Sequence, residues 1–121
     1  MTTQEIANQY YELASKGQWL EIMQKFHDDQ IVCQEPEHVA ERGVPVSTKG
    51  KEANKAKSIS NRERIETIHS QHCSEPMVAG NFFTLTLKRD VTFKPNQRMQ
   101  LEEVCVFEVK DGKIILEKFF Y

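Results

Sequence analysis

The sequence of 121 residues suits one domain with a buried core, and we expect a single domain spanning residues 1–121. Its net charge of −2 offers no basic field for nucleic acid or an anionic membrane, and no apolar run approaches the ~20 residues that cross a bilayer. The first residues do not form the basic and then apolar stretch of a secretory signal, so we expect a cytoplasmic location.

Two helices are predicted at the start of the chain. A capping-box pattern at Thr2 and Glu5 begins the first, and Gly17 suits the left-handed position after its end. A second, shorter helix follows and should end at Asp28-Asp29. Its apolar side carries Trp19, either Ile22 or Met23, and Phe26.

The middle of the chain predicts a short strand, a loop and a third helix. The strand covers residues 30–35, and Pro36 ends it. Residues 36–50 contain two prolines and two glycines, a composition typical of a loop. A helix is expected over residues 51–63, and because its apolar stripe is thin it should lie over the edge of the core. The stripe consists of Ala53, Ala56 and Ile59.

Strands fill the rest of the chain. Residues 65–73 read as one strand, and residues 77–93 as a long strand with a bend at Gly80-Asn81. Residues 101–121 should form a hairpin, because Asp111-Gly112 is the strongest short signal for a two-residue turn. The register that follows from this turn pairs Val109 with Ile114, Phe107 with Leu116 and Cys105 with Lys118.

The predicted element order is α-α-β-α-β-β-β-β, which favours an α+β fold with helices on one face of an antiparallel sheet. The hairpin register puts Glu103 and Lys118 on the core side, either at the open rim of the sheet or as the polar floor of a pocket. The opposite face carries apolar side chains that we expect to form a homodimer interface. These are Val104, Val106, Ile115, Phe119 and Tyr121.

These features together resemble the nuclear transport factor 2-like superfamily, and most closely its SnoaL-like branch. The matching features are the helix pair broken at Gly17, Asp28-Asp29 before a strand, the helix after Gly50 and the final hairpin, and the stretches SEPMVAGNFF and EEVCVFEVKDGKI are similar to that branch's later strands. The resemblance implies a cystatin-like, cone-shaped sheet that wraps around helices and encloses a pocket, with a convex face that often forms a homodimer. Isomerases, dehydratases, polyketide cyclases and non-catalytic proteins share this fold, so the fold alone selects no activity.

Glu35 is the sharpest candidate for chemistry, because it precedes Pro36 at the end of a predicted strand. A carboxyl group at the mouth of an apolar pocket has its ionised form disfavoured, which suits it to proton transfer. Ketosteroid isomerases are similar here, since their catalytic aspartate precedes a proline at the end of the same strand. That resemblance also implies that Tyr10 donates to a developing oxyanion. It places Cys105, a weak donor, where those enzymes have an aspartic acid.

Other interpretations of these residues stay open. Glu35 is otherwise a rim carboxylate paired with a loop residue, and Tyr10 a core aromatic. His38 follows in the loop and is placed to shuttle a proton or to line the pocket. His69 and His72 lie three apart on a strand and so point to opposite faces, and we expect neither a metal ion nor a cofactor.

The sequence therefore predicts a pocket protein for a small, mostly apolar ligand, with acid–base chemistry of the isomerase, dehydratase or cyclase type at Glu35, Tyr10 and His38. The alternative is a non-catalytic dimeric module that binds a ligand or a protein. Neither interpretation involves nucleic acid or a membrane. The expected pocket residues are Trp19, Met23, Phe26, Phe83, Glu103, Cys105, Phe107, Leu116 and Lys118.

Overall fold

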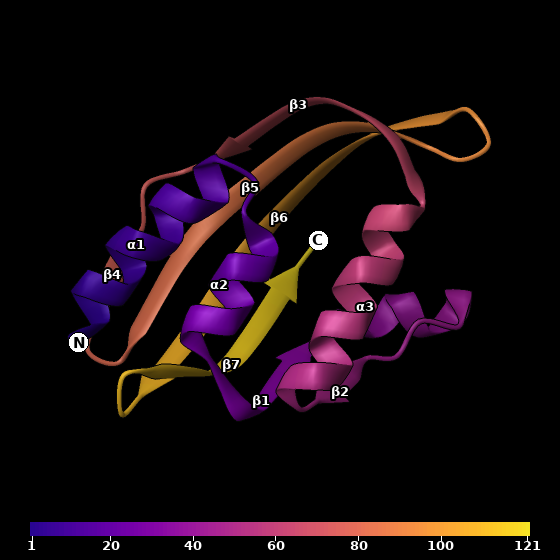
Figure 1. Ribbon diagram of the computed structural model, residues 1–121. Helices are drawn as coiled ribbons and strands as arrows, with labels where there is room; N and C mark the ends of the chain where they lie inside the picture. The colour runs from indigo at the N-terminus through magenta and orange to yellow at the C-terminus, as the bar shows by residue number, and fades with distance from the viewer.

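Three α-helices lie against one face of a curved sheet in the computed structural model, which describes residues 1–121 (Figure 1). Helix α1 covers Thr3–Ser15, α2 covers Trp19–Phe26 and α3 covers Lys51–Glu63. The predicted capping box begins α1, since the Thr2 hydroxyl accepts from the Glu5 amide and the Glu5 carboxylate accepts from the Thr2 amide. None of these helices combines the length and apolar character that a bilayer-spanning helix needs.

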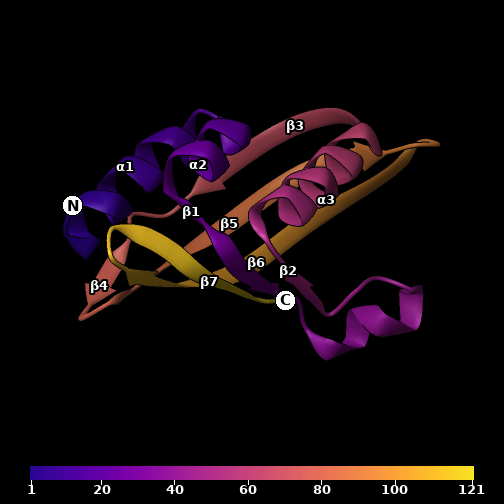
Figure 2. The same cartoon turned by 60° about the horizontal axis from the view of Figure 1, so that its bottom comes forward.

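The sheet contains seven strands in the order β2-β1-β7-β6-β5-β3, with β4 paired to β5. Their bounds are β1 His27–Gln34, β2 Ser47–Lys49, β3 Ile65–Cys73, β4 Met77–Ala79, β5 Phe82–Phe93, β6 Gln97–Lys110 and β7 Lys113–Phe120. The predicted α+β fold, a curved sheet around helices, is confirmed, and the long strands β5 and β6 show the curvature most clearly (Figure 1, Figure 2). One pairing departs from the expected antiparallel pattern, because β1 runs parallel to β7.

Three local predictions differ from the structure. The long strand expected over residues 77–93 is a hairpin of β4 and β5, because the chain turns at Gly80, whose φ is +59°. Strand β1 begins at His27 directly after α2, so Asp28-Asp29 lies within the strand. The predicted loop after Pro36 contains strand β2 and a 3-10 helix, η1 (Glu37–Arg42), which stands out from the rest of the molecule (Figure 2).

The core lies between the helices and the covered face of the sheet. Tyr10 of α1 packs against Phe83 of β5 and Phe107 of β6, with ring centroids 5.6 and 4.7 Å away. The two phenylalanine rings stack at 4.6 Å, and both are fully buried. Burying an apolar side chain of this size contributes about 1.5–3 kcal/mol, so this aromatic cluster is a main source of the fold's stability.

The hairpin of β6 and β7 follows the predicted register only next to its turn. Val109 faces Ile114 as predicted, but Glu108 then faces Leu116 because Ile115 is an extra residue in β7. Side chains alternate between the two faces of a strand, so one extra residue exchanges the faces of all later residues in β7. The predicted register is therefore wrong beyond Ile114.

The bulge changes which side chains enter the interior. Cys105 faces Phe119, and Phe107 faces Glu117, which is buried. Lys118 and Leu116, expected on the same core-side face as Glu103, lie on the outer face instead. Phe119 and Tyr121, expected on the outer face, turn toward the helices. Phe119 packs against the core, and the Tyr121 hydroxyl donates to Glu35, the residue directly after β1. The outer face keeps Val104, Val106 and Ile115 and gains Leu116 and Phe120.

Candidate functional site

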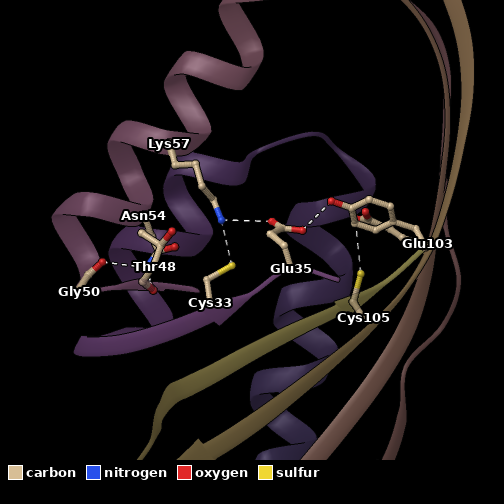
Figure 3. Close-up of polar contacts among 9 residues, drawn as sticks. Cys33, Glu35, Thr48, Gly50, Asn54, Lys57, Glu103 and Cys105 are labelled. Atoms are coloured by element: carbon tan, nitrogen blue, oxygen red, sulfur yellow. Dashed lines mark hydrogen bonds and ion pairs between the residues drawn. The ribbon is translucent and has the colours of Figure 1, made fainter. Parts of the chain in front are cut away.

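Glu35 lies directly after β1, and both of its carboxylate oxygens have a partner. Lys57 Nζ lies 3.2 Å from Oε1, and the Tyr121 hydroxyl donates to Oε2 at 2.8 Å. The Glu35 side chain is only 12% exposed, so water screens these contacts weakly. The surroundings are thus more polar than the apolar neighbours that the sequence predicted. Figure 3 shows the Glu35 carboxylate between Lys57 and the strand that carries Glu103 and Cys105.

Lys57 reaches Glu35 from α3, because the polar side of this helix faces the sheet. Asn54, one turn earlier, is buried and donates from Nδ2 to the carbonyl oxygens of Thr48 and Gly50 at 3.1 and 2.9 Å (Figure 3). The predicted orientation is wrong, since the apolar stripe of α3 is exposed; its members are Ala53, Ala56 and Ile59. Buried polar groups are tolerated when they are hydrogen-bonded; Asn54 Nδ2 meets this condition, whereas Asn54 Oδ1 is buried without a partner.

Lys57 also donates to the sulfur of Cys33, at 3.3 Å from Nζ. Burial lowers the pKa of Lys57, but the adjacent acidic groups Cys33 and Glu35 outweigh it and raise this pKa overall. Burial raises the pKa of the Cys33 thiol to about 12. The result is a protonated amine fixed between a neutral thiol and a carboxylate, which holds the Glu35 side chain in one orientation.

Glu103 of β6 is a second carboxyl group in the same interior region. Burial raises its pKa, the charge of Arg89 opposes this, and the nearby charge of Glu35 adds to the rise. The Cys105 thiol donates to Glu103 Oε1 over 3.7 Å (Figure 3). Burial and the charge of Glu103 raise the pKa of Cys105 as well, so this thiol stays protonated. Glu103 therefore keeps its proton to higher pH than an ordinary carboxyl group.

Tyr121 follows the end of β7 and connects Glu35 to His38. The carbonyl oxygen of Tyr121 lies 2.7 Å from His38 Nε2, and the two rings meet edge to face at 5.6 Å. Burial and the hydrogen bond to Glu35 raise the pKa of the Tyr121 hydroxyl. The phenol therefore remains a proton donor to Glu35, and His38 contacts the site through Tyr121.

A separate polar pair lies deeper, where β1 meets β7. His27 Nε2 and Glu117 Oε1 are 2.7 Å apart, and both side chains are buried. His27 Nδ1 is buried without a partner. A proton on Nε2 gives the hydrogen bond to Glu117 its donor, and Nδ1 has no group in reach to bond to. The charge of Glu117 contributes to the raised pKa values of Cys33, Cys105 and Tyr10.

The family model of the SnoaL-like domain matches residues 1–121. The chain belongs to the SnoaL-like family. Its structure is similar to that of a candidate SnoaL-like polyketide cyclase from Mesorhizobium loti, which is 35% identical over all of both chains, with a TM-score of 0.91. No match was found among curated proteins.

More distant structures share the fold of this SnoaL-like domain. An NTF2-like protein of unknown function from Burkholderia pseudomallei is 14% identical over 100% of this chain and 92% of its own, with a TM-score of 0.79. A protein with a ketosteroid isomerase-like fold from Catenulispora acidiphila, in complex with trimethylamine, is 15% identical over 99% and 87%, with a TM-score of 0.71. The family model confirms the predicted SnoaL-like branch, and these structures show that the fold is shared more widely.

The predicted site residues of the SnoaL-like domain occupy three different places. Glu35, Glu103 and Cys105 come together, with His38 at the edge of this group. Tyr10 belongs to the aromatic core, and burial raises its pKa well above the usual range. Phe26, Phe83 and Phe107 are also core residues, while Trp19 and Met23 are partly buried on α2. Leu116 and Lys118 lie on the outer face.

Sequence reasoning missed Lys57, Cys33 and Tyr121 as members of the site. A usable signal existed for Lys57, since Asn54 and Lys57 are three residues apart and fall on one side of a helix. No comparable signal existed for Tyr121, because its direction depends on the bulge at Ile115.

Proposed function

We propose that this SnoaL-like domain binds a small, mostly apolar organic molecule and moves a proton on it, with Glu35 as the base. The observation that carries the proposal is the nearly buried Glu35 carboxylate, paired with Lys57 and close to a second carboxyl group of raised pKa. Two carboxyl groups in environments that favour different protonation states can act as base and acid in one reaction.

The two carboxyl groups take complementary roles in this proposal. Lys57 lies 3.2 Å from Glu35 Oε1 and holds the carboxylate in the orientation from which it accepts a proton. Burial raises the pKa of Glu103, and in this proposal its carboxyl group donates a hydrogen bond or a proton to the oxygen on which charge develops. Lys57 acts as a positioning residue, because it orients the carboxylate without reaching the reacting atoms.

The reaction that fits this pair is removal of a proton next to a carbonyl group, with isomerisation, dehydration or ring closure as the outcome. Beside the ion pair of Glu35 with Lys57 the interior carries protonated thiols and aromatic rings, which suit a mostly apolar ligand better than a strongly charged one. The description of the Mesorhizobium loti protein as a SnoaL-like polyketide cyclase supports the same class of chemistry.

Deuterium exchange tests the proposal without knowledge of the natural substrate. A panel of small ketones and β-diketones is incubated in D₂O with the pure protein, and loss of the α-proton signals is followed by NMR. We expect exchange of at least one compound to be catalysed, and Glu35→Gln to reduce the rate by about 10²–10⁴-fold, which is the usual contribution of a general base.

Glu37→Gln is the matched control, because this exposed glutamate lies two residues further along the chain. It should leave the exchange rate unchanged. Exchange that persists in Glu35→Gln would show that Glu35 is not the base.

The alternative function, a non-catalytic dimeric module for a ligand or a protein, has two specific observations in its favour. Both oxygens of Glu35 are bonded within the chain, so the carboxylate is structurally satisfied without a ligand. The exposed apolar side chains Val104 and Phe120 on the outer face suit an interface. Absence of exchange with every compound, together with a stable dimer, would favour this alternative.

A further inference from the structure

The two partners of Glu35 differ in how firmly they are held. Lys57 is bonded to both Glu35 and Cys33, and its side chain is 21% exposed. Tyr121 is 47% exposed and lies beyond the last sheet pairing, that of Val104 with Phe120. Tyr121 is therefore the partner that a ligand can displace.

Any ligand that uses Glu35 must gain access to one of its oxygens. Oε1 faces a lysine that cannot leave without an unpaired charge in a poorly hydrated place, which is costly. Oε2 accepts a neutral phenol, and replacing one hydroxyl by another conserves the hydrogen bond. Access through Oε2 is thus the less costly route.

We propose that the Oε2 side of Glu35 is a binding position for an aromatic or enolic hydroxyl group, which Tyr121 fills in this structure and leaves when a ligand binds. This inference rests on the proposed function only in assuming that Glu35 faces the ligand. Tyr121 then acts as an intramolecular competitor, and the carbonyl contact with His38 keeps its ring near the site.

The chemistry around Oε2 defines the class of ligand. A hydroxyl donor to a carboxylate forms a short, charge-assisted hydrogen bond, as the 2.8 Å contact of Tyr121 does. A phenolate or enolate at the same place would face the charge of Glu35, which already helps to keep the Tyr121 hydroxyl protonated. The position therefore takes a planar, neutral hydroxyl compound.

The probe for this position is p-cresol, which is the tyrosine side chain as a free molecule, and its binding is measured by calorimetry. An internal competitor lowers the apparent affinity by the fraction of open molecules. We expect Tyr121→Ala to bind p-cresol at least tenfold more tightly than the wild type, and Tyr121→Phe to bind it more tightly than the wild type too. Phe120→Ala, which removes a ring from the outer face, should match the wild type.

A second measurement follows Tyr121 itself in the wild-type protein. With ring-labelled tyrosine, the Tyr121 NMR signal is identified by its loss in Tyr121→Phe. Saturating p-cresol should move this signal toward that of an exposed tyrosine, and the signals of Tyr10 and Tyr11 should stay in place.

Three results would overturn the inference. They are equal p-cresol affinity in wild type and Tyr121→Ala, equal affinity of Tyr121→Ala for p-cresol and toluene, and no binding to Tyr121→Ala at all. Toluene fills the same space without a hydroxyl, so it separates hydroxyl recognition from the filling of a cavity. The exchange assay with Glu35→Gln fails or succeeds independently of these results, so failure of the proposed function is distinguishable from failure of this inference.

Discussion

Glu35 and Glu103 are the same side chain in two different environments. Glu35 is hydrogen-bonded to a lysine and to a phenol. Burial is the main influence on the pKa of Glu103 and raises it, while the charge of Arg89 opposes this rise. A lysine partner stabilises the ionised carboxylate, whereas burial stabilises the protonated one. The raised pKa of Glu103 thus follows from its burial.

The raised pKa of Glu103 predicts how stability depends on pH. A carboxyl group whose pKa is higher in the folded state contributes stability below its unfolded pKa of about 4.3, and that contribution is lost as pH rises through the folded pKa. Glu103→Gln removes this titration while keeping an acceptor for the Cys105 thiol. We expect the variant to be as stable as the wild type or more stable at pH 7, as measured by urea unfolding between pH 4 and 8.

Glu102→Gln is the control for this experiment, because Glu102 is exposed and forms only a 3.7 Å surface ion pair with Lys88. Its pH dependence should follow that of the wild type. A wild-type protein that gains stability relative to Glu103→Gln as pH rises from 4 to 8 would contradict the predicted sign.

Helix α3 shows at the scale of one element how a polar face comes to be buried. Asn54 and Lys57 point to the sheet because acceptors lie opposite them there, the Thr48 carbonyl and the Glu35 carboxylate. The alanines of this helix are small and lose little by exposure to water. Satisfying polar partners therefore outweighs burying a weak apolar stripe.

Paired substitutions in α3 test this orientation. Asn54→Ala should lower the free energy of unfolding by about 1–3 kcal/mol, because the Thr48 carbonyl loses the buried amide as its donor, while the Gly50 carbonyl keeps the Asn54 backbone N–H. Ala56→Lys should change it by less than about 0.5 kcal/mol, as expected of an exposed helix position. Chemical denaturation measures both free energies of unfolding. If Ala56→Lys lowered the free energy of unfolding and Asn54→Ala left it unchanged, the alanine stripe would face the core.

At the scale of the whole molecule, the helices cover one face of the sheet and leave the other open. The open face carries exposed Val104 and Phe120 with half-buried Val106 and Leu116 beside them. Exposed apolar side chains on neighbouring strands are typical of protein interfaces. A homodimer through this face therefore remains our prediction, with Leu116 and Phe120 in the places first given to Phe119 and Tyr121.

Val106→Asp tests the homodimer. The wild type should sediment as a dimer at micromolar concentration, and the variant as a monomer, because the change places a charge in the desolvated centre of a two-fold interface. Ala56→Asp adds the same charge on the exposed side of α3 and should stay dimeric. A wild-type protein that sediments as a monomer would contradict the prediction.

The local sequence alone determined most elements of this protein. Helix α3 and strand β3 have the predicted bounds, the capping box at Thr2 begins α1, and the turn at Asp111-Gly112 joins β6 and β7. These features depend on contacts within a few residues, such as caps, turns and the spacing of apolar side chains, which a sequence displays directly. The same patterns carried the resemblance that led to the family, and with it the curved sheet.

Only the tertiary structure decided which side chains form the site. The extra residue Ile115 in β7 follows no local rule, yet it turns Glu117 and Tyr121 inward and Lys118 outward. Lys57 meets Glu35 across 22 residues of sequence because α3 packs against β1. Sequence patterns placed Glu35 correctly at a strand end, but its partners follow from bulges and packing, where the free energy depends on distant segments together.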